Sequence, residues 1–193
     1  MTEAENGFKR LLQVLDGLGI PFLIGGSLAS SIHGIARATM DVDLVADIRP
    51  EQVKPLAAEL GSEFYADTDV ILPAIRAGRA FNIIHYRSTY KFDIFPASTH
   101  PYHREQLARR EFVESALFGA GKLRFPVASP EDIVLAKLDW YKRGGASSER
   151  QWNDVLGVIR IQRQKLDLFY MRKWAAELEI SGLLERALAQ AGQ

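Results

Sequence analysis

Three aspartates have the residue type and spacing of a divalent-metal site. Asp41 and Asp43 are two residues apart in an otherwise apolar run, so a strand would place both carboxylates on one face. Asp93 lies between Phe92 and Ile94 in a second apolar run and supplies a third carboxylate. Mg²⁺ and Mn²⁺ prefer oxygen ligands, and ions held by shared carboxylates can clamp the reacting oxygens of a phosphoryl group. We therefore predict that these aspartates hold Mg²⁺ (or Mn²⁺) and act in catalysis.

A glycine turn precedes the aspartate pair. Gly25, Gly26 and Ser27 follow a short apolar run and come directly before a segment with helical character. Glycines at a strand-to-helix turn let backbone amides approach an anion, and the helix dipole favours negative charge at the same place. The three residues predict a phosphate-binding turn. Their ordinary alternative is a tight turn with a helix cap.

A second Asp-x-Asp pair provides an internal comparison. Asp67 and Asp69 have the same spacing as Asp41 and Asp43, but no glycine turn comes before them. We predict that this second pair caps a helix or stabilises a loop. For the first pair, the ordinary alternative is a set of solvated carboxylates at the end of a strand.

The composition is that of an ordinary globular protein, with 47% hydrophobic and 25% charged residues. Lys plus Arg and Asp plus Glu both number 24, so no strong overall charge draws the chain to nucleic acid or membranes. Because cysteine is absent, disulfides, thiolate zinc sites and a cysteine nucleophile are excluded. The polar N-terminus is unlike a signal peptide, and no apolar run approaches the roughly 20 residues that span a membrane. We expect a soluble, cytoplasmic protein.

Apolar periodicity and breaker residues predict an α/β half, residues 1–128, followed by a helical half, residues 129–193. Strands are expected at 21–24, 42–46, 64–65, 81–86, 90–95, 112–118 and 122–127, with a hairpin turn at 87–89. Helices are expected at 8–18, 28–33, 51–60 and 70–77, and then at 133–142, 149–163, 168–178 and 182–190. Ser129 followed by Pro130 predicts the start of the first later helix.

The order of these features resembles the DNA polymerase β-type nucleotidyltransferase superfamily over most of the chain. That order is a strand, a Gly-Gly-Ser turn, a helix, an Asp-x-Asp strand and a lone aspartate on a later strand. Four stretches are similar to small bacterial nucleotidyltransferases of the abortive-infection and toxin type: Gly26-Ser27-Leu28-Ala29, His33-Gly34, Arg37-Ala38-Thr39 and Asp41-Val42-Asp43-Leu44. Three later segments resemble the helical half of the same group: Ser129-Pro130-Glu131-Asp132, Lys137-Leu138 and Glu149 to Asp154.

The resemblance implies an α/β nucleotidyltransferase fold, in which a mixed β-sheet carries helices mainly on one face and a C-terminal helical subdomain packs on it. It implies that Gly25, Gly26 and Ser27 bind the triphosphate. It assigns the metals to Asp41 and Asp43, and activation of the attacking hydroxyl to Asp93. In such proteins the residues that match Lys137 and Asp154 lie beside the triphosphate and the metal site.

Arg37 or Lys137 would supply the positive charge that offsets the negative charge of the triphosphate. Ordinary roles stay open for these residues. Arg37 could be a structural partner of a carboxylate, and Lys137 could extend to solvent from an apolar helix. Asp154 has Arg150 at the i,i+4 spacing that is typical of surface ion pairs.

The predicted function is a Mg²⁺-dependent nucleotidyltransferase that moves a nucleoside monophosphate from a nucleoside triphosphate such as ATP onto an acceptor. Transfer RNA or another RNA, a protein hydroxyl and a small molecule all stay open as acceptors. A small basic patch of Arg104, Arg109 and Arg110 could serve an RNA end. The alternative is a non-catalytic binding or regulatory module on the same fold, such as a toxin-antitoxin component with an antitoxin partner.

Overall fold

The computed structural model describes residues 2–35, 41–97, 100–115 and 123–192. They form two compact units. The first unit consists of Met1–Ile24 and Met40–Val127, and the second of Gly25–Thr39 and Ala128–Gln193. Arg37, a predicted nucleotide-binding residue, lies outside the described residues, as do residues 116–118 and 122 of the predicted strands.

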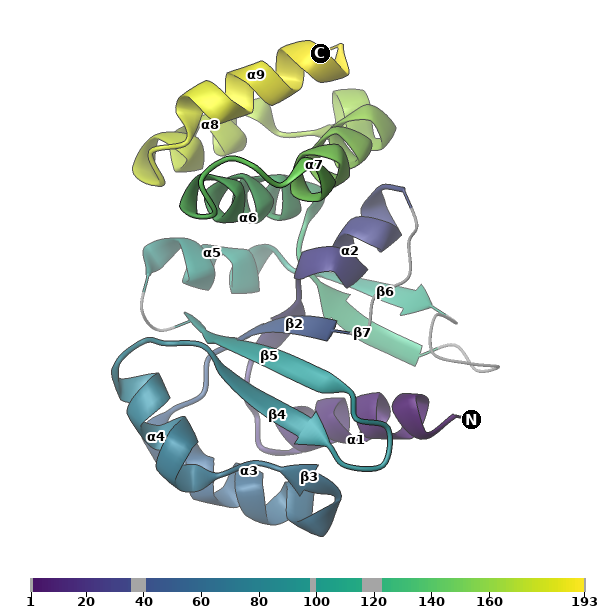
Figure 1. Cartoon of the computed structure of the whole chain (residues 1–193), viewed down its shortest axis with the longest axis vertical. Helices are drawn as coiled ribbons and strands as arrows, with labels where there is room; N and C mark the ends of the chain where they lie inside the picture. The colour runs from purple at the N-terminus through teal and green to yellow at the C-terminus, as the bar shows by residue number, and fades with distance from the viewer. Residues whose placement is uncertain (1, 36–40, 98–99, 116–122, 193) are drawn as a thin grey trace. The chain divides into compact units, whose positions relative to one another are not determined.

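The first unit is built on a mixed sheet whose described strands follow the order β3-β4-β5-β2-β1-β7-β6 (Figure 1). The strands are β1 (Phe22–Ile24), β2 (Asp41–Ala46), β3 (Phe64–Tyr65), β4 (Phe81–His85), β5 (Lys91–Pro96), β6 (Glu111–Ser115) and β7 (Leu123–Val127). The β2–β5 and β1–β7 pairs are parallel, and the other neighbouring pairs are antiparallel. The helices of this unit are α1 (Glu3–Gly17), η1 (Pro50–Gln52), α3 (Val53–Leu60), η2 (Gly61–Glu63), α4 (Thr68–Arg76) and α5 (Pro101–Arg109). Figure 1 shows α1, α3 and α4 on the same side of the sheet.

Helix α1 fixes which face of the sheet is covered. Its Phe8 is fully buried, and its ring lies 6.4 Å from the ring of Phe92 and 5.6 Å from that of Phe125. Gly7 has to be a glycine, because a Cβ there would lie 2.6 Å from the imidazole of His85. The face that carries Phe92 and Phe125 is therefore the core face.

Strands β2 and β5 alternate as the sequence predicts. Val42, Leu44, Phe92 and Ile94 are at most 1% exposed, whereas the residues between them are partly or fully exposed. Since successive side chains point to opposite faces, the aspartates of both strands lie on the face away from this core. The predicted alternation of carboxylates and core residues is confirmed.

The second unit is helical. It contains α2 (Gly26–His33), α6 (Pro130–Arg143), α7 (Glu149–Gln162), η4 (Arg163–Lys165), α8 (Leu168–Glu177) and α9 (Ser181–Ala191). Helix α2 packs against both α6 and α7. A Cβ at Gly34 would lie 3.0 Å from the side chain of Val158 and 2.8 Å from the Ser30 carbonyl oxygen, so glycine permits this close approach.

A buried polar network stabilises the start of α6. Ser129 caps the helix, as predicted, by accepting a hydrogen bond from the Asp132 amide. Asp132 has no exposed surface, and its carboxylate accepts hydrogen bonds from the hydroxyls of Ser129 and Tyr170, at 3.0 and 2.7 Å. Buried polar groups of this kind cost free energy unless they are paired, so the network specifies how α8 packs on α6.

The structure contains one helix, α5, that the sequence did not predict. The predicted domain boundary at residue 128 stays a prediction; within the described residues, α2 groups with the later helices because it packs on α6 and α7. No helix in the described part of the chain is both long and apolar enough to cross a membrane.

Candidate functional site

Parallel strands β2 and β5 bring the three predicted metal ligands together on one face of the sheet. Their register pairs Asp43 with Asp93 and Asp41 with Lys91. Because paired residues on adjacent strands point the same way, the two strands present three carboxylates and one ammonium on the same face of the sheet. We call Asp41, Asp43, Lys91 and Asp93 the acidic cluster.

Lys91 sits among the carboxylates of the acidic cluster. Its Nζ lies 3.1 Å from Oδ2 of Asp93 and 3.9 Å from Oδ1 of Asp41. The hydrogen bond to Asp93 raises the pKa of Lys91 above its usual value, and the negative charges of Asp93, Asp41 and Asp43 act in the same direction. Lys91 therefore stays a cation at neutral pH.

Asn82 holds the other oxygen of Asp93. The antiparallel register of β4 and β5 pairs Asn82 with Asp93, and the Asn82 amide nitrogen donates a hydrogen bond to Oδ1. The two oxygens of Asp93 thus accept from different donors, one neutral and one charged. This arrangement fixes the direction of the carboxylate.

The acidic cluster fits a divalent cation in its donor chemistry and in its strand register. Hard cations take carboxylate oxygens, and the cluster supplies three carboxylates from adjacent strands. As the described side chains are placed, no three acidic or histidine groups are gathered closely enough to hold an ion. Lys91 supplies the positive charge between Asp41 and Asp93 instead.

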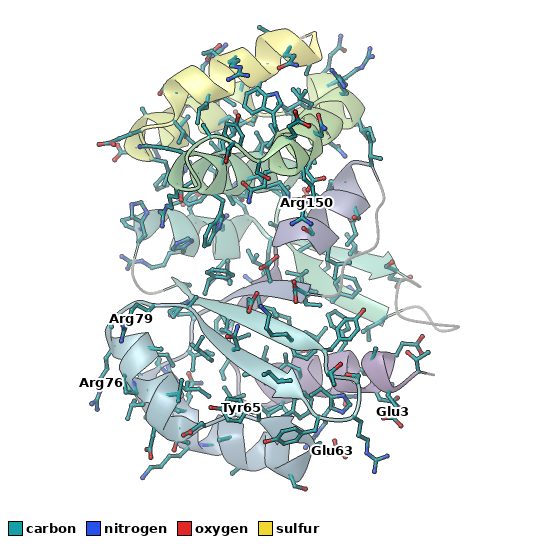
Figure 2. All side chains as sticks on the ribbon, in the orientation of Figure 1. Glu3, Glu63, Tyr65, Arg76, Arg79 and Arg150 are labelled. Atoms are coloured by element: carbon teal, nitrogen blue, oxygen red, sulfur yellow. The ribbon has the colours of Figure 1, made fainter. Side chains whose placement is uncertain are left out.

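A hollow lies between α4 and strands β3 and β4 in the first unit. It has a volume of about 380 Å³ and is lined by Tyr65, Val70, Ala74, Arg79, Ala80, Phe81 and Asn82. Figure 2 shows two of these side chains, Tyr65 on β3 and Arg79 between α4 and β4. Asn82 belongs both to the lining and to the hydrogen bond with Asp93. Asn82 therefore connects the hollow to the third aspartate of the cluster.

The predicted phosphate-binding turn forms the start of α2 in the second unit. Gly25 is the N-cap residue and makes no side-chain cap, and Gly26 has φ of +55°, which favours glycine. A Cβ at Gly25 would meet no described atom within 4 Å, so packing does not require a glycine there. Glycine at this position instead leaves the backbone open to close approach by a ligand.

Lys137 and Asp154 form an ion pair between α6 and α7 of the second unit. The distance from Nζ of Lys137 to Oδ2 of Asp154 is 2.8 Å, and the two side chains are 9% and 11% exposed. The sequence alone suggested Arg150 as the partner of Asp154, but Arg150 is exposed and the structure gives Asp154 a partner on another helix, α6. Lys137 does not simply extend to solvent.

The second Asp-x-Asp pair has the predicted structural role. Asp67 is the N-cap of α4, and its Oδ1 accepts a hydrogen bond from the Asp69 amide at 2.8 Å. Equal spacing in the sequence therefore gives a helix cap in one place and a row of strand carboxylates in the other.

Two residues of the site were missed or undervalued by the sequence analysis. Asn82 gave no signal of its own, because counting back from the predicted turn at 87–89 pairs Asp93 with Ile83, whereas the observed register pairs it with Asn82. Lys91 could have been found from its position two residues before Asp93, which puts both on one strand face.

Comparison with protein-family models and with curated proteins gave no match. Solved structures do match. A nucleotidyltransferase-like antigenic protein from Paracoccidioides brasiliensis superposes with a TM-score of 0.57 at 21% identity, over 97% of this chain and 92% of that chain. The antibiotic-resistance factor ANT(2'')-Ia in solution gives a TM-score of 0.51 at 16% identity, over 96% and 94% of the two chains. The complex of ANT(2'')-Ia with adenylyl-2''-tobramycin gives 0.52 at 14% identity, over 92% and 98%.

The chain has the nucleotidyltransferase fold. The match extends over nearly the whole chain, so it includes both the sheet that carries the acidic cluster and the C-terminal helices. In this nucleotidyltransferase fold the observed order is β1, the glycine turn with α2, the Asp-x-Asp strand β2 and the later strand β5 with Asp93. The observed order agrees with the order on which the sequence resemblance rests.

Proposed function

We propose that this protein is a Mg²⁺-dependent nucleotidyltransferase that transfers a nucleoside monophosphate from a nucleoside triphosphate to a hydroxyl group of a small molecule. The observation that carries the proposal is the register of β2 and β5, which sets Asp43 beside Asp93 and Asp41 on the same face of a nucleotidyltransferase-fold sheet. Lys91 offsets only one of the three negative charges, so the face keeps a net negative charge that a divalent cation would neutralise.

Asp41, Asp43 and Asp93 would hold the divalent ion. A bound Mg²⁺ supplies positive charge that stabilises the developing charge on the transferring phosphoryl group. The side chains of the cluster determine where that charge is available, because β2 and β5 fix their spacing.

Asp93 has a second role in the proposal. The acceptor oxygen attacks the α-phosphorus of the triphosphate, the bond between that phosphorus and the β-phosphate oxygen breaks, and pyrophosphate leaves. The proton of the acceptor hydroxyl passes to the Asp93 carboxylate. Asn82 donates a hydrogen bond to Oδ1 of Asp93 and so keeps the direction of this carboxylate fixed.

The triphosphate would be bound by the glycine turn and by cations. Gly25 and Gly26 offer backbone amides at the start of α2, and Ser27 adds a hydroxyl. Arg37 and Lys137 are the proposed counter-charges, and Asp154 would act by holding the Lys137 ammonium in position. These roles follow from the residue types and from the superfamily resemblance.

The proposed acceptor is a small molecule bound in the hollow beside Asn82. A volume of about 380 Å³ falls in the range of small-ligand sites. Support also comes from ANT(2'')-Ia, which was solved with an adenylylated small molecule, adenylyl-2''-tobramycin. Arg79 lines the hollow of this chain, so a neutral or anionic acceptor is favoured over a polycationic one.

Incubation with each α-³²P-labelled nucleoside triphosphate, Mg²⁺ or Mn²⁺ and a cell extract tests the proposal. We expect wild type to place label in the small-molecule fraction. Asp93→Asn should remove that label, whereas Asp69→Asn, which alters the structural Asp-x-Asp pair, should leave it unchanged. Label in RNA or protein would show that the acceptor is an RNA or a protein and not a small molecule. No label with any triphosphate would favour the non-catalytic binding module.

A further inference from the structure

We propose that Lys91 is a resident counter-ion of the acidic cluster, which must leave Asp93 and Asp41 before a divalent cation can bind there. Lys91 would thereby lower the affinity of the cluster for metal in the absence of nucleotide and couple metal binding to nucleotide binding. The inference rests on the proposed function and names a regulation of the same site.

The position of Lys91 is set by the sheet. Lys91 and Asp93 alternate with Phe92 on β5, and Phe92 is fixed in the core by the ring of Phe8. The register with β2 places Lys91 beside Asp41. The ammonium is thus held among the carboxylates by the strands.

The contacts of Lys91 use the oxygens that a cation would use. Its Nζ is 3.1 Å from Oδ2 of Asp93, while Oδ1 of the same carboxylate accepts from Asn82. An ammonium and a divalent ion at these oxygens would repel each other strongly at such short distances. The Lys91 ammonium at these oxygens therefore disfavours binding of a divalent ion there, and a bound ion disfavours the ammonium.

Lys91 is able to leave without disrupting the site. Its side chain is 42% exposed, whereas that of Asp93 is 19% exposed. An exposed lysine on a flexible stem exchanges partners at little cost. Asn82 is neutral and bonds the other oxygen, so Asp93 keeps its direction after the ammonium has withdrawn.

The net charge of the acidic cluster explains why metal binding would depend on nucleotide binding. With Lys91 in place, three carboxylates and one ammonium leave a net negative charge on this face. When a nucleoside triphosphate binds, its phosphates offer the released ammonium a new anionic partner. Nucleotide would therefore raise metal affinity more in the presence of Lys91 than in its absence.

Mn²⁺ binding by the whole protein, followed by electron paramagnetic resonance of the free ion, tests the inference without any need for turnover. We expect Lys91→Met to bind Mn²⁺ about tenfold more tightly than wild type in the absence of nucleotide, because one unit of positive charge about 4 Å away is removed. Lys54→Met is the matched control: it removes the same charge from an exposed position on α3 and should leave Mn²⁺ affinity within about twofold of wild type. Melting temperatures of the three proteins check that each is folded.

A second arm adds the α,β-methylene analogues of ATP and GTP. The gain in Mn²⁺ affinity on adding the analogue should be smaller for Lys91→Met than for wild type. Equal Mn²⁺ affinities of Lys91→Met and Lys54→Met, or weaker binding by Lys91→Met, would overturn the role of Lys91 and leave the proposed function intact. Absence of Mn²⁺ binding in every variant, with and without the analogues, would overturn both.

Discussion

The molecule contains two lysine–aspartate pairs of similar length in opposite environments. Lys91 and Asp93 lie 3.1 Å apart on an open sheet face, whereas Lys137 and Asp154 lie 2.8 Å apart between α6 and α7 and are about 10% exposed. An exposed pair contributes little to stability and exchanges its partners easily. A buried pair is costly to break, because the remaining charge has no water to replace its partner.

The exposed pair can exchange its partners, whereas the buried pair cannot do so at low cost. The open pair sits in the acidic cluster, where a cation can be exchanged during function. The buried pair joins two helices, so its first effect is on the packing of the helical unit. The sequence predicted Lys137, and not Lys91, as the functional lysine. The structure places Lys91 between two predicted metal ligands and places Lys137 in an ion pair with Asp154.

Breaking the buried pair should have the largest effect on stability. Lys137→Met leaves Asp154 without its 2.8 Å partner, and we expect a loss of about 3 kcal/mol in the free energy of unfolding. Lys91→Met should change it by less than about 1 kcal/mol. Urea denaturation of both variants measures the difference. Equal losses for the two variants would show that burial does not distinguish the pairs.

A buried hydrogen bond from a tyrosine hydroxyl to a carboxylate in the same unit should have an intermediate effect. Tyr170→Phe removes the donor to the fully buried carboxylate of Asp132, and we expect a loss of about 1 to 3 kcal/mol. Tyr65→Phe changes a partly exposed tyrosine on β3 and should cost much less. Thermal unfolding of both variants tests the expectation, and a negligible shift for Tyr170→Phe would mean that the network does not hold α8 on α6.

The smallest effect is expected at an exposed pair of the helical unit. Arg172 donates a hydrogen bond to Glu185 and lowers the pKa of that carboxyl below its usual 4.5. A lowered pKa in the folded state contributes stability above the unfolded value, and this contribution is lost as the pH falls through the folded value. Glu185→Gln should therefore be slightly less stable than wild type at pH 7. The difference should shrink as the pH falls below 4.5 and vanish below the lowered pKa of the folded state.

Stability curves against pH for wild type and Glu185→Gln provide the measurement. A difference in the free energy of unfolding that persists or grows in acid would contradict the predicted direction of the pH dependence.

Much of the fold could be predicted because local patterns and the tertiary structure agree. The alternation around Asp43 and Asp93 matches a strand with one buried face, and Ser129 caps α6 with the residue type that helix starts prefer. Helix α5 was missed because its N-cap is His100, whose ring nitrogen accepts from the Tyr102 amide at 3.1 Å. Histidine is not among the usual capping residues.

The site could be predicted in its residue types but not in its contacts. The aspartates were recognisable from their spacing, whereas the pairing of Asp43 with Asp93 depends on the register of strands that are distant in the sequence. For the same reason, sequence reasoning did not find Asn82. The burial of Lys137 depends on how α6 packs against α7, which an isolated helix pattern does not specify.

The most direct test of the central claim measures the melting temperature of wild type and Asp43→Asn with and without Mg²⁺ and each nucleoside triphosphate. Wild type should gain about 5 °C with Mg²⁺ and its triphosphate together, which corresponds to ligand at about one hundred times its dissociation constant. Asp43→Asn should melt at the same temperature as unliganded wild type or higher, because like charges repel less, and should show no metal-dependent gain. Asp69→Asn is the matched control and should respond as wild type does. A wild-type protein without any metal-dependent gain, or an Asp43→Asn variant that does not fold, would contradict the account.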